Sequence, residues 1–180
     1  PDMVVVATGA APFKPPIDAV DQPFVYQAWD VLQGKVQTGQ NVVIVGGGSV
    51  GLETAVHLAR KGTISPHQLY FLSLHQAESP EFLHDLMVKG VKNITVIEMA
   101  PRIGQDIGPS TRWVILKELA LRGVELVTRA KMKDISPGQI VYTNAEENDV
   151  TLPADTVVLA MGSRPNNSLA QELEGLGVDV

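Results

Sequence analysis

The sequence of 180 residues contains no cysteine. This absence excludes disulfide bonds, a redox-active dithiol, thiolate zinc sites and cysteine-ligated iron–sulfur clusters within this chain. Long apolar runs are also missing, since none approaches the roughly 20 residues that a membrane-spanning helix needs. We therefore expect a protein that does not cross a membrane and holds no metal through cysteine.

Positive charge is in the minority as well. Lysine and arginine number 14 against 20 aspartate and glutamate residues, which gives a formal net charge of −6. An acidic chain is not expected to hold nucleic acid through phosphate contacts. No secretory signal precedes the first predicted strand, so the expected location is cytoplasmic. The length and composition fit a single domain over residues 1–180.

What the sequence does contain is a glycine-rich turn within Asn41–Glu53. The apolar run Val42–Val45 predicts a buried strand, and the G-x-G-x-x-G turn that follows predicts a dinucleotide site. Gly46 allows a sharp turn off the strand, Gly48 leaves room for a pyrophosphate, and Gly51 lets the following helix approach the sheet. The turn consists of Gly46, Gly47, Gly48, Ser49, Val50 and Gly51.

A glycine motif alone is a weak signal, because glycines also collect in ordinary turns. Here the apolar residues after the turn recur at helical spacing, which predicts a helix over Ser49–Arg60 with its positive end toward the phosphates. A bare turn without a nucleotide remains the alternative.

About thirty residues separate this helix from the next predicted strand, Ile94–Glu98. Two helix starts, Ser65-Pro66 and Ser79-Pro80, place a capping serine before a proline at the first helical position. We therefore expect residues 62–93 to form a helical-hairpin insert. It should emerge at the amino ends of the strands, far from a cofactor at their carboxyl ends.

The rest of the chain predicts an α/β fold with a central parallel sheet and a three-stranded antiparallel meander. A short helix over Val25–Leu32 and a last helix over Ser168–Leu176 complete it. The remaining elements are a loop (Met99–Gly108), a helix (Pro109–Arg122), a strand (Val124–Thr128), the meander (Lys131–Ile135, Gln139–Thr143, Val150–Leu152) and a buried strand (Thr156–Ala160).

The two ends of the chain suggest a piece of a longer protein. Met3–Gly9 predicts a buried strand with no initiator methionine before it, and the proline-rich Ala10–Asp21 predicts an extended, irregular segment. At the other end, Gly177–Val180 indicates a strand that is just beginning.

Glu98 ends the second strand of the dinucleotide unit, where a carboxylate accepts hydrogen bonds from the adenosine ribose. Its distance from Gly46 falls to the usual value of about 20 residues once the insert is removed. A carboxylate there repels a ribose phosphate, which favours NAD(H) over NADP(H). Arg102 leaves NADP(H) open because its guanidinium could reach a phosphate. A solvated strand end is the alternative for Glu98.

No residue is predicted to be catalytic, and no metal site is expected. Serines such as Ser49, Ser110 and Ser163 lack a G-x-S-x-G elbow and a partner histidine. The histidines show no ligand spacing with a supporting carboxylate. They are His57, His67, His75 and His84.

Several motifs in this order resemble the NAD(P)H-binding module of the pyridine-nucleotide–disulfide oxidoreductase superfamily. They are a strand ending in Ala7–Gly9, the glycine motif with Glu53 two residues after it, the meander and Gly162–Asn166. Two further segments, Ala28–Leu32 and Pro101–Trp113, resemble the carboxyl-terminal half of the NADH:flavin oxidoreductase / 2,4-dienoyl-CoA reductase family.

This resemblance implies a Rossmann-like three-layer FAD/NAD(P)-binding domain set within an FAD domain, with residues 1–39 and 163–180 at the seam. It also implies an upstream barrel that carries FMN and an iron–sulfur cluster, and hydride transfer from NAD(P)H to FAD. The barrel, the cluster cysteines and both FAD motifs are absent from these 180 residues. The chain is therefore expected to bind NAD(H) without turnover of its own. The resemblance also allows a homo-oligomer.

Carried over by position, the resemblance places Glu53 near the nicotinamide carboxamide and Gly162 at the nicotinamide ribose. For Glu53 the alternative is a helix-face pair with His57. The predicted cofactor-binding residues are Gly46, Gly47, Gly48, Ser49, Val50, Gly51, Glu53, Glu98, Met99, Arg102 and Gly162. Two other interpretations remain: a non-catalytic nucleotide-sensing or interaction module that docks through the insert, and a site for the ADP half of FAD.

Overall fold

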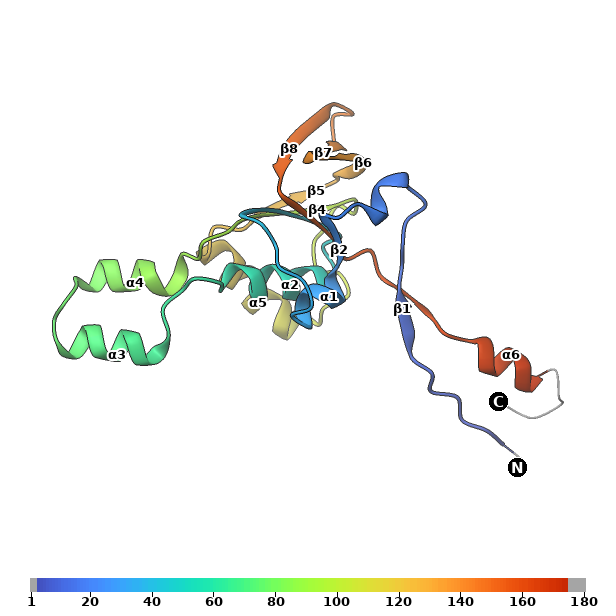
Figure 1. The fold of residues 1–180 in the computed structure, drawn as a ribbon, viewed down its shortest axis with the longest axis horizontal. Coiled ribbons are helices and arrows are strands. Elements are labelled where there is room, and N and C mark those ends of the chain that lie inside the picture. Colours follow the sequence, from blue (N-terminus) through green and yellow to red (C-terminus); the bar gives the residue numbers. More distant parts are fainter. Residues whose placement is uncertain (1–2, 175–180) are drawn as a thin grey trace.

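The computed structural model describes residues 3–174, and its centre is a parallel five-stranded β-sheet (Figure 1). The strands lie in the order β2-β9-β3-β4-β5, and each neighbouring pair is parallel. They comprise β2 (Val25–Gln27), β3 (Asn41–Val45), β4 (Asn93–Glu98), β5 (Glu125–Thr128) and β9 (Thr156–Leu159). The predicted central parallel sheet is confirmed. Its carboxyl edge is where open α/β sheets bind ligands.

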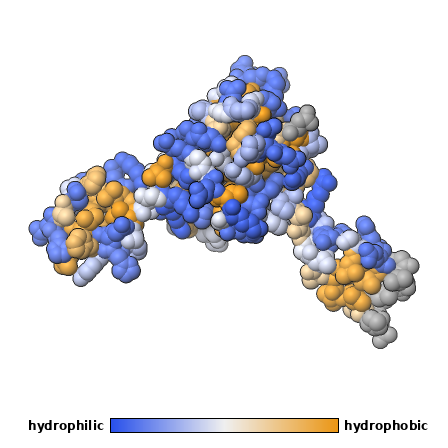
Figure 2. Space-filling view, viewed as in Figure 1, coloured by the Kyte–Doolittle hydropathy of each residue, from blue (hydrophilic) through white to orange (hydrophobic). Residues whose placement is uncertain are grey.

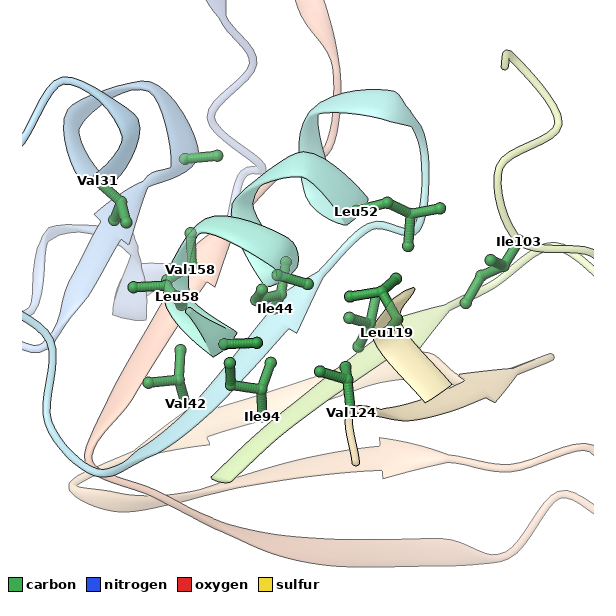
Figure 3. Close-up of a cluster of buried hydrophobic side chains, with 14 residues drawn as sticks. Val31, Val42, Ile44, Leu52, Leu58, Ile94, Ile103, Leu119, Val124 and Val158 are labelled. Atoms are coloured by element: carbon green, nitrogen blue, oxygen red, sulfur yellow. The ribbon is translucent and has the colours of Figure 1, made fainter. Parts of the chain in front are cut away.

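Three helices cover one face of the sheet (Figure 3). They are α1 (Ala28–Leu32), α2 (Ser49–Ala59) and α5 (Pro109–Leu121). In α2 the spacing of three and four residues brings Leu52, Ala55 and Leu58 onto the buried side of the helix. These side chains join Ile44 of β3 and Leu119 of α5 in one core, where both are 0% exposed.

The antiparallel meander covers the opposite face of the sheet (Figure 1). It consists of β6 (Lys131–Ser136), β7 (Gly138–Thr143) and β8 (Asp149–Ala154). Ile135 and Ile140 of the meander are buried in a second cluster with Val43 and Val157 of the parallel sheet. Helices, sheet and meander form three layers, so the predicted Rossmann-like α/β architecture is confirmed.

The predicted insert forms two helices that project as an arm from the body (Figure 1). They are α3 (Pro66–Leu74) and α4 (Pro80–Val88). Ser65 makes a capping box with Gln68, and the Ser79 side chain accepts a hydrogen bond from the Phe82 N–H, as their serine-proline signals predict. The Ile64 N–H donates to the Leu86 carbonyl at 3.0 Å and closes the base of the arm.

Little of the arm is buried. No residue of α3 is buried, and apolar side chains form much of the arm's surface in Figure 2. The large exposed ones include Tyr70, Phe71 and Leu74 of α3 and Phe82 of α4. The arm follows the carboxyl end of α2 and precedes β4, so it starts from the amino edge of the sheet as predicted.

A two-stranded antiparallel ladder on the other side of the body was not predicted. It pairs β1 (Ala10–Pro12) with β10 (Ser163–Pro165). The Phe13 N–H extends it by donating to the Gly162 carbonyl at 2.9 Å, and the Arg164 guanidinium lies 4.7 Å from the centre of the Phe13 ring. The ladder leads to α6 (Ser168–Glu174), on the side of the molecule away from the arm (Figure 1).

The prediction of a buried strand over Met3–Gly9 is wrong. This segment forms no strand within residues 3–174, and Val5 is 87% exposed. A strand needs a neighbouring backbone for its N–H and C=O groups, and an apolar run alone does not supply one. The predicted strand over Gly177–Val180 and the end of the last predicted helix lie outside the described residues.

The prediction of one helix over Val25–Leu32 is half wrong. Its first three residues form β2, which pairs with β9 at the edge of the sheet, and only Ala28–Leu32 is helical. Tertiary pairing outweighs local propensity in such short segments. The proline-rich Ala10–Asp21, predicted to be irregular, contains β1 and the 3-10 helix η1 (Asp18–Asp21).

The other predicted helices and strands lie within a few residues of their expected bounds. Within residues 3–174, no helix is long and apolar enough to cross a bilayer.

Candidate functional site

The glycine turn between β3 and α2 lies at the carboxyl edge of the sheet, and its geometry requires glycine. Gly46 has a φ of +111°, and a Cβ there would lie 2.3 Å from the Ala160 carbonyl oxygen. A Cβ on Gly51 would lie 1.9 Å from the carbonyl oxygen of Gly46. No side chain fits at either contact, so α2 starts directly against the turn. This is the close approach that a dinucleotide fingerprint provides.

Glu98 ends β4 beside this turn, and its carboxylate binds backbone at both oxygens. Oε2 accepts a hydrogen bond from the Gly47 N–H at 2.6 Å, and Oε1 accepts one from the Ala100 N–H at 2.7 Å. These two bonds fix the carboxylate between the glycine turn and the loop that follows β4. A fixed carboxylate at this position can accept hydrogen bonds from ribose hydroxyls.

A cavity of about 350 Å³ lies over the carboxyl edge, between the ends of β3, β4 and β9 and the start of β6. This volume lies within the range of roughly 300–1,000 Å³ that ligand pockets span. Gly46, Glu98 and Met99 line it, so the fold brings these three predicted residues together. The other lining residues are Val45, Ile97, Ala130, Lys131, Met132, Ala160 and Met161. The residues here fit a nucleotide: bare glycine backbone for phosphates, a carboxylate for ribose and an apolar wall.

The loop between β4 and α5 contributes a residue that the sequence did not single out. Asp106 accepts hydrogen bonds from the Ser49 N–H at 2.9 Å and from the Ser49 hydroxyl at 2.8 Å, at the first residue of α2. Burial alone would raise the pKa of Asp106, but the hydrogen bonds from Ser49 and from its own backbone hold that pKa below its usual value.

The same loop is anchored to the turn at two more points. The Gly104 N–H donates to the Gly47 carbonyl at 2.7 Å, and the Ile103 side chain is buried in the core beside α2. A Cβ on Gly47 would lie 2.6 Å from Ile103 Cγ1. The sequence predicted a loop over Met99–Gly108 and showed a resemblance of Pro101–Trp113 to a family segment, but neither indicated where Asp106 would lie.

The remaining predicted residues lie outside this cavity. Glu53 is exposed on α2 and lines a different hollow with Arg60 and Glu118, toward α5. No ion pair of the described chain joins Glu53 to His57. Burial, together with the nearby Lys61 and Arg60 charges, lowers the pKa of His57.

Arg102 and Gly162 flank the site without lining the cavity. Arg102 is exposed and lines a hollow at the start of α5 with Arg112 and Trp113. Gly162 follows Met161, a lining residue, and its carbonyl accepts the hydrogen bond from Phe13. Val50, in the first turn of α2, packs against the helix-side core.

Ion pairs link the carboxyl end of α2 to α5, away from the cavity. Glu118 of α5 accepts hydrogen bonds from Arg60 Nε at 2.8 Å and from Arg122 Nε at 2.9 Å. The Arg60 hydrogen bond, against the cost of burial, lowers the pKa of Glu118. This cluster fixes the far end of α2 against α5. The structure shows no group of three or more histidine, aspartate or glutamate side chains arranged to hold a metal within residues 3–174.

Comparison with known proteins agrees with this geometry. The sequence profile of the pyridine nucleotide-disulphide oxidoreductase family matches residues 1–180. A metal reductase of Desulforamulus reducens is 49% identical over 172 residues, which is 96% of this chain and 26% of that protein. An NADH oxidase of Thermoanaerobacter brockii is 32% identical over 185 residues, covering 100% of this chain and 24% of that protein.

A solved structure of a 2-naphthoyl-CoA reductase in complex with 2-naphthoyl-CoA superposes with a TM-score of 0.71 at 27% identity. The match covers 95% of this chain and 22% of that one. The chain therefore spans about a quarter of the length of the curated relatives reported above. Members of the matched family are flavoproteins that use NAD(P)H and FAD. From the full-length profile match and the shared fold, we conclude that this chain belongs to the pyridine nucleotide-disulphide oxidoreductase family.

Proposed function

We propose that this chain binds NAD(H) at the carboxyl edge of its parallel sheet and presents the nicotinamide to an FAD held outside these 180 residues. The observation that carries the proposal is the contact between the glycine turn and Glu98. The Gly47 N–H donates to Glu98 at 2.6 Å, so a carboxylate suited to binding ribose hydroxyls lies against a turn that requires glycine.

The chain's own residues bind and orient the cofactor. The first turn of α2, which begins at Ser49, turns the positive end of its dipole toward the pyrophosphate. Glu98 accepts hydrogen bonds from the adenosine ribose, and its negative charge favours NAD(H) over NADP(H). Met99 and Met161 supply apolar cavity wall. Bound NADH would supply the hydride, and the protein contributes position.

The β1–β10 ladder supports an FAD domain on the side away from the arm. Apolar Met3 and Val5, 71% and 87% exposed, line a hollow of about 500 Å³ with Asn166 and Ala170. Figure 2 shows the apolar surface of this region. We propose that residues 1–39 and 163–180 face the FAD domain of the same polypeptide there. The chain would then perform no turnover alone.

The relatives support a reductase as the parent protein. An upstream barrel with FMN and an iron–sulfur cluster, as in an enoate or 2,4-dienoyl-CoA reductase, belongs to this proposal. The cluster ligands would have to come from outside this chain, which has no cysteine. The metal reductase and the 2-naphthoyl-CoA reductase that this chain resembles are named for different electron acceptors, so the proposal names no single substrate. A homo-oligomer is compatible with this assignment.

The test is Glu98→Gln in the protein at its natural full length, with Glu81→Gln on the arm as the matched control. Titration with NADH and NADPH is combined with measurement of bound FAD. Loss of the charged acceptor should weaken NADH roughly tenfold, since hydrogen bonds to charged groups contribute about 1.5–3 kcal/mol. The nucleotide preference should shift toward NADPH while the FAD content stays unchanged. The Glu81→Gln control should keep the nucleotide affinities of the unaltered protein.

Other outcomes favour the alternatives. Loss of FAD from Glu98→Gln with unchanged NADH affinity would make this the site of the ADP half of FAD. Tighter binding of NADPH than NADH by the unaltered protein would overturn the role given to Glu98. Nucleotide binding that never reduces the flavin would favour a sensing module.

A further inference from the structure

The positive end of α2 is already occupied by an anionic group of the chain itself. Asp106 binds the Ser49 N–H with both carboxylate oxygens, at 2.9 Å and 3.1 Å, and binds the Ser49 hydroxyl at 2.8 Å. A Cβ on Gly48, the residue before the helix, would lie 3.1 Å from Asp106 Oδ2. The carboxylate therefore lies against the part of the turn where a dinucleotide fingerprint binds phosphate.

This carboxylate is held by the helix end rather than by a positive side chain. The ion pairs of residues 3–174 do not include Asp106. Its main partner is Ser49, a residue of the phosphate-binding turn in the proposed site. Hydrogen bonds to the charged form keep the pKa of Asp106 below its usual value, so the group is an anion at neutral pH.

We propose that Asp106 is an internal competitor for the cofactor's pyrophosphate, and that it must leave Ser49 before a dinucleotide can bind. The inference rests on the proposed NAD(H) site. A phosphate and a carboxylate cannot both take the Ser49 N–H, and two anions at hydrogen-bonding distance of one donor repel each other. The apparent cofactor affinity is then the intrinsic affinity multiplied by the fraction of molecules in which Asp106 has left Ser49.

The loop that carries Asp106 is anchored on both sides of this residue. Asp106 follows Gly104, whose N–H binds the Gly47 carbonyl, and it precedes Ile107, which packs on the helix-side core. Glu98, bound to Gly47 on the other side of the turn, keeps its place for the ribose.

The experiment compares Asp106→Asn with the unaltered protein, both at natural full length. Asparagine can still accept a hydrogen bond from Ser49, but it carries no charge. The matched control is Asp155→Asn at the amino edge, where a carboxylate likewise accepts backbone N–H bonds, from Gln40 at 3.1 Å and Asn41 at 2.7 Å. Dissociation constants are measured for NADH and for inorganic pyrophosphate alone, with amide hydrogen exchange at Ser49 as a second readout.

We expect Asp106→Asn to bind both NADH and pyrophosphate roughly tenfold more tightly, because a charge-assisted hydrogen bond no longer has to be broken. Ser49 should exchange its amide hydrogen faster in the nucleotide-free variant. Asp155→Asn should show neither gain. Unchanged or weaker binding of pyrophosphate and NADH by Asp106→Asn would overturn the proposal and leave Asp106 as a helix cap.

The two proposals can fail separately. If neither protein binds NADH, the proposed function fails, and tighter pyrophosphate binding by Asp106→Asn still supports the competitor. If the unaltered protein binds NADH and Asp106→Asn binds it no better, the proposed function stands and the role of Asp106 is refuted.

Discussion

The two edges of the parallel sheet both leave backbone groups unpaired at strand ends, and different charged side chains satisfy them. At the amino edge, Asp155 accepts N–H bonds from Gln40 and Asn41, and the Lys92 ammonium donates to the carbonyls of Thr38 and Gly39 at 2.9 Å and 2.8 Å. At the carboxyl edge, Glu98 and Asp106 accept N–H bonds from the glycine turn. In both places charged side chains satisfy the backbone that strand ends leave unpaired.

The difference lies in what each edge can accommodate. The amino edge carries the arm, and no residue of α3 is buried against the body. At the carboxyl edge the glycine turn leaves no room for a side chain at Gly51, where a Cβ would lie 1.9 Å from the Gly46 carbonyl oxygen. The amino edge, where side chains satisfy the backbone at the strand starts, can carry an insert. The carboxyl edge is shaped around a turn without side chains and carries none there, and mutations can test this contrast.

The largest expected effect comes from the core that both edges share. Ile44 of β3 is 0% exposed between the helices and the sheet. Ile44→Ala should lower the free energy of unfolding by about 2–5 kcal/mol through lost burial and a cavity. Urea denaturation measures this. Leu74→Ala on the arm, a side chain 61% exposed, should change stability by less than about 0.5 kcal/mol. Equal losses would mean that the arm packs as firmly as the core.

A smaller effect, confined to the carboxyl edge, is expected from Gly51→Ala. The new methyl group must push α2 away from the turn, which should cost about 1–3 kcal/mol of stability. NADH binding should be lost with it, because the helix start no longer faces the phosphates. Gly108→Ala is the control, since a Cβ there meets nothing within 4 Å. Calorimetric titration of both variants with NADH measures the affinities. Retained affinity in Gly51→Ala would contradict the need for α2 to start directly against the turn.

The smallest effect is expected on the arm. Ser65→Ala removes the capping box of α3 and should cost about 1 kcal/mol locally. Hydrogen exchange should become faster in α3 while NADH affinity stays unchanged. Ser73→Ala, an exposed serine inside the same helix, is the control and should leave exchange unaltered. A change in NADH affinity with Ser65→Ala would show that the two edges are coupled.

Most elements of the fold could be predicted because their signals are local. The glycine turn, the serine-proline caps of α3 and α4, and the alternating meander each fix their own geometry within a few residues. The wrong predictions concern segments whose structure depends on pairing with a strand far away in the sequence. Met3–Gly9 has the apolar content of a strand but forms no ladder in the described chain, where the Gly9 carbonyl accepts one backbone bond from the Asn166 N–H. Val25–Gln27 became a strand because β9 lies beside it.

Within the candidate site, the sequence identified groups by their chemistry and position along the chain. Gly46 and Glu98 were found because a strand precedes one and contains the other, and parallel strands bring their carboxyl ends together. Asp106 was missed because it sits in a loop, and no spacing rule links it to Ser49. Glu53 was given a role by resemblance, and it lines a hollow toward α5 outside the cavity.

The sequence by itself determined the order of elements, the need for glycine at the turn and the carboxylate at the end of the second strand. These follow from backbone sterics and side-chain periodicity, which act over short stretches of chain. Only the tertiary structure decided that the arm stands clear of the body, that β1 pairs with β10, and that a carboxylate from the next loop occupies the start of α2. Those outcomes depend on contacts between residues far apart in the chain, which no local pattern encodes.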